Sequence, residues 1–356
     1  MYLEHLHLLA CPHCYGTLHD ASSQRVVGDE ALFGGALGCR ACKTEYPVIN
    51  GVPRFVPREN YASGFGLEWT KHARTQYDSH SGLTVSEQRF LGETHWPRDQ
   101  RGQVILEVGS GSGRFTEQAA RTGATVVSLD FSYAVDANYA SNGARRNVLI
   151  VQADVFAMPF RAATFDRLFC FGMLQHTPSP RRAFRALPRV LRPGGALCAD
   201  IYKISLFRTV LQTKYWVRPL TRRMNPDRLY AFVRTWVDFM WPLAQLIRKL
   251  PKGYAINWRL LVADYSFLGL EGEMLKEWSY LDTFDMLAPR YDRPATLKTF
   301  RGWAIEAGLL DIDAEYTPHG VVLRATSPPP RECLVRAWNT CTAPSNPSTL
   351  WGWTTG

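Results

Sequence analysis

Short apolar runs alternate with stretches of helical periodicity along residues 101–202. Helical patterns begin at Arg114 and Ser132, and a third covers 179–191. Strands that alternate with helices in this way predict a parallel sheet with helices on both faces. The runs that predict the five strands are VILEV (104–108), TVVSLD (125–130), VLIVQAD (148–154), FDRLFCFG (165–172) and ALCADIY (196–202).

The alternation stops after residue 202 and resumes near residue 296. A helix over 296–308 precedes two strand-like runs, LLDIDAEYT and VVLRATS, which a PHG turn separates. With the five earlier runs, these predict a Rossmann-like, doubly wound α/β sheet of seven strands. Residues 203–294, which interrupt the pattern, are aromatic, basic and helical in character. They predict a helical insertion after the fifth strand.

The first strand runs into a turn that reads Gly-Ser-Gly-Ser-Gly at 109–113. Glycines there allow positive φ between strand and helix and let the backbone approach a ligand closely. A pyrophosphate-binding GxGxxG turn would need glycine at position 114, which is Arg114. A phosphate loop would need a following Gly-Lys-Ser/Thr, which is also missing. Neither phosphate-binding pattern therefore fits this turn.

The residues over 107–113 instead form an ExGxGxG motif. An acid ends each of the next two strands, Asp130 and Asp154, and LRPGG (191–195) precedes the fifth strand. With these motifs the chain resembles the class I S-adenosylmethionine (SAM) methyltransferases over about 101–202 and 296–326. The resemblance implies a seven-stranded methyltransferase fold with SAM as cofactor. Vicinal ribose hydroxyls suit a bidentate carboxylate, and a sulfonium with an ammonium suits an acidic pocket.

The resemblance also assigns cofactor-binding residues, position by position. Gly109, Gly111 and Gly113 would lie under the methionine moiety, while Glu107 would orient its amino group. Asp130 would bind the ribose hydroxyls and Asp154 the adenine amino group. The complete candidate cofactor site is Glu107, Gly109, Gly111, Gly113, Asp130, Phe131, Asp154, Val155 and Phe171.

Four of the eight cysteines form two CxxC pairs, Cys11/Cys14 and Cys39/Cys42, separated by 24 residues. This spacing is typical of two knuckles that close one tetrahedral Zn²⁺ site. Four thiolates leave no open position for substrate, so the expected Zn²⁺ is structural rather than catalytic. The surrounding residues resemble the small zinc-ribbon proteins that activate tRNA and protein methyltransferases, here fused in line.

The formal net charge is +9, and the excess lies in one segment. Residues 203–252 contain eleven Lys and Arg residues against two acids, Asp227 and Asp238, among several Trp and Tyr residues. Aromatics beside basic residues suit a membrane interface or a lipid-linked phosphate, and they also suit RNA. A third interpretation is a helical cap with core aromatics and solvated arginines.

The end of the fourth strand, CFGMLQHTP (170–178), lacks the Asn/Asp-Pro-Pro-aromatic signature that the family uses to methylate amines of bases. His176 is the candidate catalytic residue, because a base is needed when the acceptor is a hydroxyl. Alternatively, His176 caps the following helix or packs beside the cofactor. Phe171 and Gln175 are candidate walls of the methyl channel. Asp282, Asp285 and Tyr291 are candidates for a pocket that takes a hydroxylated substrate.

These patterns predict a SAM-dependent methyltransferase that acts, by O-methylation, on a small or lipid-linked metabolite such as a sugar or a natural-product intermediate. The alternatives are an rRNA or tRNA methyltransferase and a non-catalytic binding protein with the same fold. No secretory signal or membrane-span pattern is seen, so we expect a cytoplasmic protein, with peripheral membrane contact through 203–252. The expected segments are 1–57 (zinc ribbon), 58–100 (linker and N-terminal lid), 101–202 (methyltransferase core with the SAM site), 203–294 (helical substrate cap), 295–327 (end of the core) and 328–356 (flexible tail).

Overall fold

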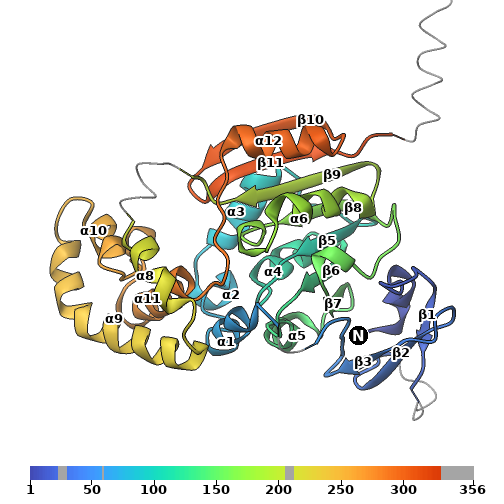
Figure 1. Cartoon of the computed structure of the whole chain (residues 1–356), viewed down its shortest axis with the longest axis horizontal. Helices are drawn as coiled ribbons and strands as arrows, with labels where there is room; N and C mark the ends of the chain where they lie inside the picture. Colours follow the sequence, from blue (N-terminus) through green and yellow to red (C-terminus); the bar gives the residue numbers. More distant parts are fainter. Residues whose placement is uncertain (23–29, 58–59, 205–211, 330–356) are drawn as a thin grey trace, which may run out of the picture.

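The computed structural model describes residues 1–22, 30–57, 60–204 and 212–329. At its centre lies a seven-stranded sheet with the order β10-β11-β9-β8-β5-β6-β7 (Figure 1). Strands β5 to β9 run parallel, whereas β11 is antiparallel to both β9 and β10. The strands are β5 (Val104–Val108), β6 (Thr125–Asp130), β7 (Val148–Gln152), β8 (Phe165–Cys170), β9 (Leu191–Ile201), β10 (Leu310–Thr317) and β11 (Gly320–Thr326).

Helices cover both faces of this sheet, because successive strand residues point to opposite sides. Ile105 of β5 packs into a cluster with Phe90 and Phe115, whereas its neighbour Leu106 packs with Phe184 on the other face. The first face carries α3 (Val85–Thr94), α4 (Arg114–Arg121) and α5 (Val135–Asn142). The second carries α6 (Pro180–Ala186) and α12 (Leu297–Glu306). The predicted α/β fold class is therefore confirmed.

The N-terminal segment forms a separate antiparallel sheet that shares its core with the large one. Strand β4 lies against β7, where the Phe55 amide donates to the Gln152 carbonyl at 2.8 Å. Leu8 and Leu37 belong to the same buried cluster as Val151 and Phe160. The small domain consists of a 3₁₀ helix, η1 (Leu3–Leu8), and the strands β1 (Leu18–Asp20), β2 (Gly35–Cys39), β3 (Glu45–Ile49) and β4 (Val52–Pro53).

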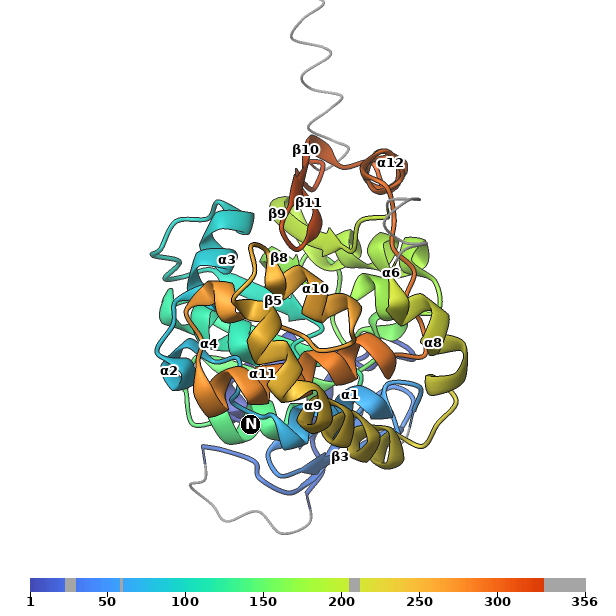
Figure 2. The same cartoon turned by 90° about the vertical axis from the view of Figure 1, so that its left-hand side faces the viewer.

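The insertion after β9 is helical, and it packs against the segment that precedes the core. It leaves and rejoins the core at one place, where the Ala295 amide donates to the Tyr202 carbonyl at 2.9 Å. Its helices lie at the end of the molecule opposite the small sheet (Figure 1), and Figure 2 views them face on. The insertion contains α8 (Thr213–Thr221), α9 (Pro226–Arg248), α10 (Gly253–Arg259), the 3₁₀ helix η5 (Ser266–Leu268) and α11 (Gly272–Leu287).

Helices α1 (Ser63–Lys71) and α2 (Asp78–Ser81) lie in the predicted lid segment, and α1 packs against this cap. Leu67 of α1 packs against the cluster that Tyr230 and Phe284 form between α9 and α11. The indole of Trp278 donates to the Thr75 carbonyl at 3.0 Å. Lid and cap are thus one packed unit, although some two hundred residues separate them in sequence.

Three boundaries differ from the predicted ones by three residues or more. Helix α5 begins at Val135 rather than at Ser132, because the Ser132 hydroxyl donates to Asp130 and accepts from the Ala134 amide instead. The helix predicted over 179–191 ends at Ala186 and continues as a 3₁₀ turn, η4 (Leu187–Val190). LRPGG belongs to β9 rather than to the loop before it.

The predicted tail falls outside the described residues from position 330 onward. None of the described helices is both long and apolar enough to cross a bilayer.

Candidate functional site

A cavity of about 1420 Å³ opens at the carboxyl ends of the parallel strands, beneath the cap. Its walls come from the glycine turn after β5, the ends of β6, β7 and β8, and helices α1, α10 and α11. In parallel α/β sheets the crevice outside these strand ends is where ligands bind. Of the predicted site residues, the cavity is lined by Gly109, Gly111, Asp130, Phe131, Asp154, Val155, Phe171 and His176.

The glycine turn holds its shape because its backbone takes positive φ where other side chains would collide. Gly109 has φ +87°, and a Cβ there would lie 2.5 Å from Met173 Cβ. At Gly111, φ is +53° and a Cβ would lie 3.0 Å from the indole nitrogen of Trp69. Gly113 is the N-cap residue of α4, behind the cavity wall. The turn therefore keeps a small-residue floor directly under the lid helix.

Asp130 ends β6 and binds the glycine turn. Its Oδ2 accepts from the Gly111 amide at 2.8 Å, and its Oδ1 accepts from the Ser132 amide and hydroxyl at 2.8 and 2.7 Å. A carboxylate offers about four acceptor positions, so lone-pair capacity is left toward the cavity. Burial raises the pKa of Asp130 above its usual value.

Asp154 lies on the same cavity wall after β7. It caps the 3₁₀ helix η2 (Val155–Ala157), with Oδ1 accepting from the Phe156 amide at 2.9 Å. Tyr61 packs on Phe131 with ring centres 4.7 Å apart, and burial and the charges of Asp154 and Asp130 raise the pKa of its hydroxyl. The two strand-end carboxylates thus face one cavity, with a tyrosine close to both.

Glu107 lies just behind this wall. Its Oε2 accepts from the hydroxyls of Thr116 (2.5 Å) and Ser128 (3.0 Å), while its buried Oε1 has no hydrogen-bond partner among the described residues. Burial raises the pKa of Glu107 to about 7. Its predicted contact with a ligand's amino group stays a prediction, because the side chain is not part of the cavity wall.

Two partly buried arginines, Arg89 and Arg114, lie on the α3–α4 side of the cavity. Arg89 pairs with Asp200 and, at 3.3 Å, with Glu93. Arg114 forms no ion pair within the described part of the chain, and its guanidinium lies 4.5 Å from the Phe115 ring centre. Burial and the nearby Arg89 lower its pKa to about 10. A partly buried cation without a carboxylate partner can bind an anionic group of a ligand.

His176 ends the 3₁₀ helix η3 (Leu174–His176) after β8 and contacts the cap. Its Nδ1 lies 3.0 Å from the Tyr291 carbonyl oxygen. A carbonyl only accepts hydrogen bonds, so Nδ1 carries the hydrogen and Nε2 carries a lone pair. The ring packs against Phe65 and Tyr202, at 5.0 and 5.5 Å. It does not cap α6, whose N-cap residue is Ser179.

The cap side of the cavity carries carboxylates among aromatic rings. Asp282 of α11 accepts from the Gln76 amide at 3.2 Å, and burial and Asp285 raise its pKa to about 7. Glu68 of α1 is fully buried, and its Oε2 has no partner among the described residues. Its pKa is raised well above the usual value by burial and by Asp285 and Asp282. The aromatic side chains of this wall are Phe65, Trp69, Tyr202, Tyr254, Trp258, Tyr265, Phe267 and Trp278.

The sequence analysis singled out Asp282 and Asp285 but missed Glu68 and Arg114. A signal for Glu68 was present, because Phe65, Glu68 and Trp69 fall on one helix face at i, i+3 and i+4. An acid between two aromatics on a buried face is unusual.

Tyr291 packs on Tyr61 with ring centres 5.6 Å apart, next to the cavity. Gln175 is fully buried but does not line it.

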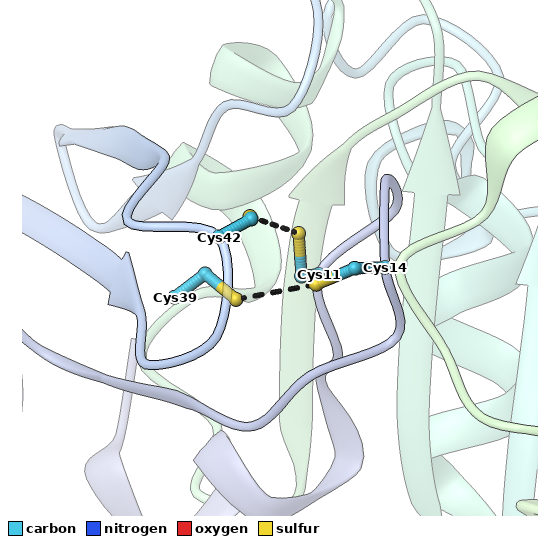
Figure 3. A group of neighbouring side chains, drawn as sticks. All are labelled: Cys11, Cys14, Cys39 and Cys42. Carbon is cyan, nitrogen blue, oxygen red and sulfur yellow. Dashed lines mark hydrogen bonds between the residues drawn. The ribbon is translucent and has the colours of Figure 1, made fainter.

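The four cysteines of the small domain meet at one point (Figure 3). All four sulfur atoms lie within 4.8 Å of one another, and the Cys11–Cys42 and Cys14–Cys39 sulfurs are 3.5 Å apart. Zn–S bonds of about 2.3 Å in a tetrahedron place the sulfurs about 3.8 Å apart. The Tyr46 hydroxyl lies 3.1 Å from the Cys11 sulfur. The residues present therefore fit a tetrahedral Zn²⁺ site.

Comparison with known proteins identifies two domains in the chain. Residues 106–199 match the methyltransferase domain family, and residues 3–51 match the Trm112p-like protein family. The chain is thus a protein with a methyltransferase domain. To that domain it joins a Trm112p-like domain at its N-terminal end, as the resemblance predicted.

Among the curated relatives is the demethylmenaquinone methyltransferase of Renibacterium salmoninarum, 31% identical over 38% of this chain and 61% of that protein. The ubiquinone biosynthesis O-methyltransferase of Xanthomonas oryzae pv. oryzae is 33% identical over 28% of this chain and 43% of that protein. The chain thus spans less than two thirds of the length of both. A solved complex with the Haloferax volcanii Trm112 methyltransferase activator is 12% identical, covers 77% of this chain and 99% of that one, and has a TM-score of 0.42.

Proposed function

We propose that the chain is a SAM-dependent methyltransferase that O-methylates a small or lipid-linked metabolite. One observation carries the proposal: a single cavity is lined by the glycine turn, both strand-end acids, His176 and residues of the cap. The methyltransferase domain at 106–199 supports the activity. SAM would supply an electrophilic methyl group, and the chain's residues would bind it and position the acceptor.

The residues present fit the methyl donor. Asp130 has acceptor capacity left for ribose hydroxyls, and Asp154 has an oxygen free to accept from an exocyclic amine. The unpaired guanidinium of Arg114 suits the donor's carboxylate. The floor formed by Gly109 and Gly111 gives the methionine portion close access to the backbone. The lid helix α1 would exclude water above it.

His176 would act as the general base for a hydroxyl acceptor. Its Nε2 lone pair would take the hydroxyl proton while the oxygen forms a bond to the methyl carbon and the carbon–sulfur bond breaks. The Tyr291 carbonyl fixes the tautomer that leaves Nε2 unprotonated. Positioning and exclusion of water would supply much of the remaining acceleration.

The cap supports a ring-containing acceptor that carries hydroxyl groups. Aromatic walls stack against rings, and the Glu68 carboxyl group, whose Oε2 has no partner among the described residues, can accept from a hydroxyl donor. The relatives named for quinone methylation favour an acceptor of this chemistry attached to a lipid. Such an acceptor would bring the protein to a membrane surface, in line with the cytoplasmic, peripheral location predicted from the sequence.

The four-cysteine cluster would hold structural Zn²⁺. Thiolates fill all four positions, so no site is left for a substrate. The Tyr46 hydroxyl would stabilise the Cys11 thiolate as a neighbouring donor. In this proposal the Trm112p-like domain supports the fold of the chain, and the reaction takes place in the cavity.

An RNA acceptor is the second candidate. It is favoured by the Trm112p-like domain together with the basic insertion. RNA contacts by several arginines would make log affinity fall steeply with log salt concentration. A non-catalytic binding protein of the same fold is the third candidate.

The first test is calorimetry with SAM, which is carried out on the wild-type protein and on the Asp130→Ala variant. We expect Asp130→Ala to weaken binding by about 1.5–3 kcal/mol, the scale of hydrogen bonds to a charged group. Asp99→Ala, an exposed acid paired with Arg101, serves as the matched control and should bind as the wild type does. Absence of SAM binding in a folded, zinc-loaded sample would reject the enzyme.

Labelled SAM then identifies the acceptor class. Purified full-length protein is incubated with cell extract separated into lipid, glycan, small-molecule and RNA fractions. Label in the lipid, glycan or small-molecule fraction supports the first proposal, and label in RNA alone supports the second. SAM binding without label in any fraction supports the non-catalytic protein.

A further inference from the structure

The cap exposes an unusual concentration of large apolar side chains. Ten of the eighteen exposed large hydrophobic residues of the described chain lie between Trp216 and Ile256. Single exposed apolar residues are normal on protein surfaces, whereas a concentration of them marks an interaction surface. The ten are Trp216, Leu220, Met224, Phe232, Phe239, Leu243, Leu246, Leu250, Tyr254 and Ile256.

Helix α9 and the turn that follows it arrange half of these residues as one stripe. Phe232, Phe239, Leu243, Leu246 and Leu250 follow one another at steps of seven, four, three and four residues, with the half-buried Trp236 in the first gap. Steps of three and four residues keep side chains on one face of a helix. The adjoining face, which includes Leu229, Val233 and Val237, already packs on α11. We call the exposed row the α9 stripe.

Exposed basic side chains lie along α9 and near both of its ends. None of the exposed Lys and Arg side chains on and beside α9 forms an ion pair with a carboxylate in the part of the chain that the structure describes. Of the two acids in 203–252, Asp238 is neutralised by Lys276 at 2.7 Å. The exposed basic residues on and beside the helix are Arg222, Arg223, Arg228, Arg234, Lys249 and Lys252.

The exposed surface continues into the cavity wall. Tyr254 and Phe267, whose ring centres are 5.1 Å apart, are both exposed and both line the cavity. Helices α9 and α10 form the end of the molecule farthest from the small sheet (Figures 1 and 2). The aromatic side chains at α10 therefore belong both to the exposed surface and to the cavity wall.

We propose that α9 and its flanking basic residues dock the protein on the surface of an anionic lipid bilayer, with α10 at the cavity mouth facing the lipid. An amphipathic helix with large apolar residues on one side and cations beside them lies in the membrane interface. Each Lys or Arg near an anionic surface strengthens binding about fivefold. The leucines of the α9 stripe disfavour RNA as the occupant, since RNA binding relies on aromatic stacking and phosphate contacts.

Vesicle sedimentation tests this proposal on the full-length protein without SAM, so its outcome does not depend on methyl transfer. We expect binding to phosphatidylcholine vesicles that contain phosphatidylglycerol and at least tenfold weaker binding to pure phosphatidylcholine. Phe239→Ser combined with Leu246→Ser should reduce binding at least tenfold. The matched control is Ile305→Ser with Tyr316→Ser, two residues of similar exposure on α12 and β10, which should leave binding unchanged.

The charge contribution has its own variant pair. Arg222→Gln with Arg223→Gln should weaken binding to anionic vesicles about tenfold or more, whereas Arg185→Gln with Arg301→Gln, on α6 and α12, should not. All variants change exposed residues, and circular dichroism checks that they are folded. Equal loss in test and control pairs, or tight binding of RNA without binding of vesicles, would overturn the proposal.

Discussion

At the scale of single residues, the tautomer of His176 is the feature with the most direct chemical consequence. The hydrogen bond from Nδ1 to the Tyr291 carbonyl leaves Nε2 as the acceptor nitrogen. We expect His176→Gln to lower the rate of methyl transfer by 10²- to 10⁴-fold, the usual contribution of a general base. SAM affinity should change less than twofold. The exposed His80→Gln is the control, and a rate loss explained by SAM affinity would contradict the assignment.

Asp282 gives a prediction about stability. Its pKa is about 7 in the folded protein and about 4 in an unfolded chain. The folded state therefore loses stability as pH rises through this interval, by about 2–4 kcal/mol once Asp282 is ionised. We expect Asp282→Asn to stabilise the ligand-free protein at pH 8, with a gain that shrinks toward pH 4. Urea unfolding at several pH values measures it, and a gain independent of pH would contradict the assignment.

Sequence reasoning reaches residues of this kind only when they follow a local pattern. Asp130 and Asp154 were predicted to share a site because the carboxyl ends of parallel strands lie at one edge of the sheet, and the structure places both on one cavity. Glu68 and Asp282 come together from segments more than two hundred residues apart. Their proximity depends on how the lid packs on the cap, which no local spacing encodes.

At the scale of elements, α1 and α9 are joined by a buried polar contact. His72, at the end of α1, lies 2.8 Å from the Tyr230 hydroxyl of α9. Burial lowers the pKa of His72 to about 4, whereas a histidine in an unfolded chain has a pKa of about 6.5. The neutral ring therefore supports the folded state above pH 6.5, and this support is lost as pH falls toward 4.

The variant His72→Gln tests this contact between lid and cap. We expect the free energy of unfolding of the wild type to fall by about 3 kcal/mol more than that of the variant between pH 7 and pH 4. Denaturant unfolding at each pH, followed by tryptophan fluorescence, measures the difference. Parallel pH curves for the two proteins would show that His72 does not titrate in this interval on unfolding.

Element boundaries were predicted best where periodicity alone decides them. Strands β5, β6 and β8 begin at the predicted residues. The predicted start of α5, Ser132, was three residues too early. Serine is a favoured N-cap residue, but the Ser132 hydroxyl binds the Asp130 carboxylate. The helix therefore begins only at Val135. A contact between side chains overrode a local preference.

At the scale of the whole molecule, the small domain and the large sheet share one hydrophobic core. The spacing of the cysteines predicted a four-thiolate site and a domain over 1–57. It did not predict that Leu8 and Leu37 would pack in one cluster with Val151 and Phe160. The sequence of this 57-residue segment does not reveal which part of the rest of the chain its apolar residues pack against. The contact with β7 therefore had to be seen in the structure.

This shared core extends the consequence of metal loss beyond the small domain. Replacing Cys11 and Cys14 with Ser should release Zn²⁺ and unfold residues 1–57, because so small a domain depends on its metal for folding. The unfolded segment would uncover β7, so we expect the melting temperature of the entire chain to fall by at least about 5 °C. Metal analysis, limited proteolysis and calorimetry measure these effects, and chelation followed by Zn²⁺ addition is the reversible control. A variant that keeps its metal, or melts at the wild-type temperature, would show that the cysteine cluster does not stabilise the fold through a bound ion.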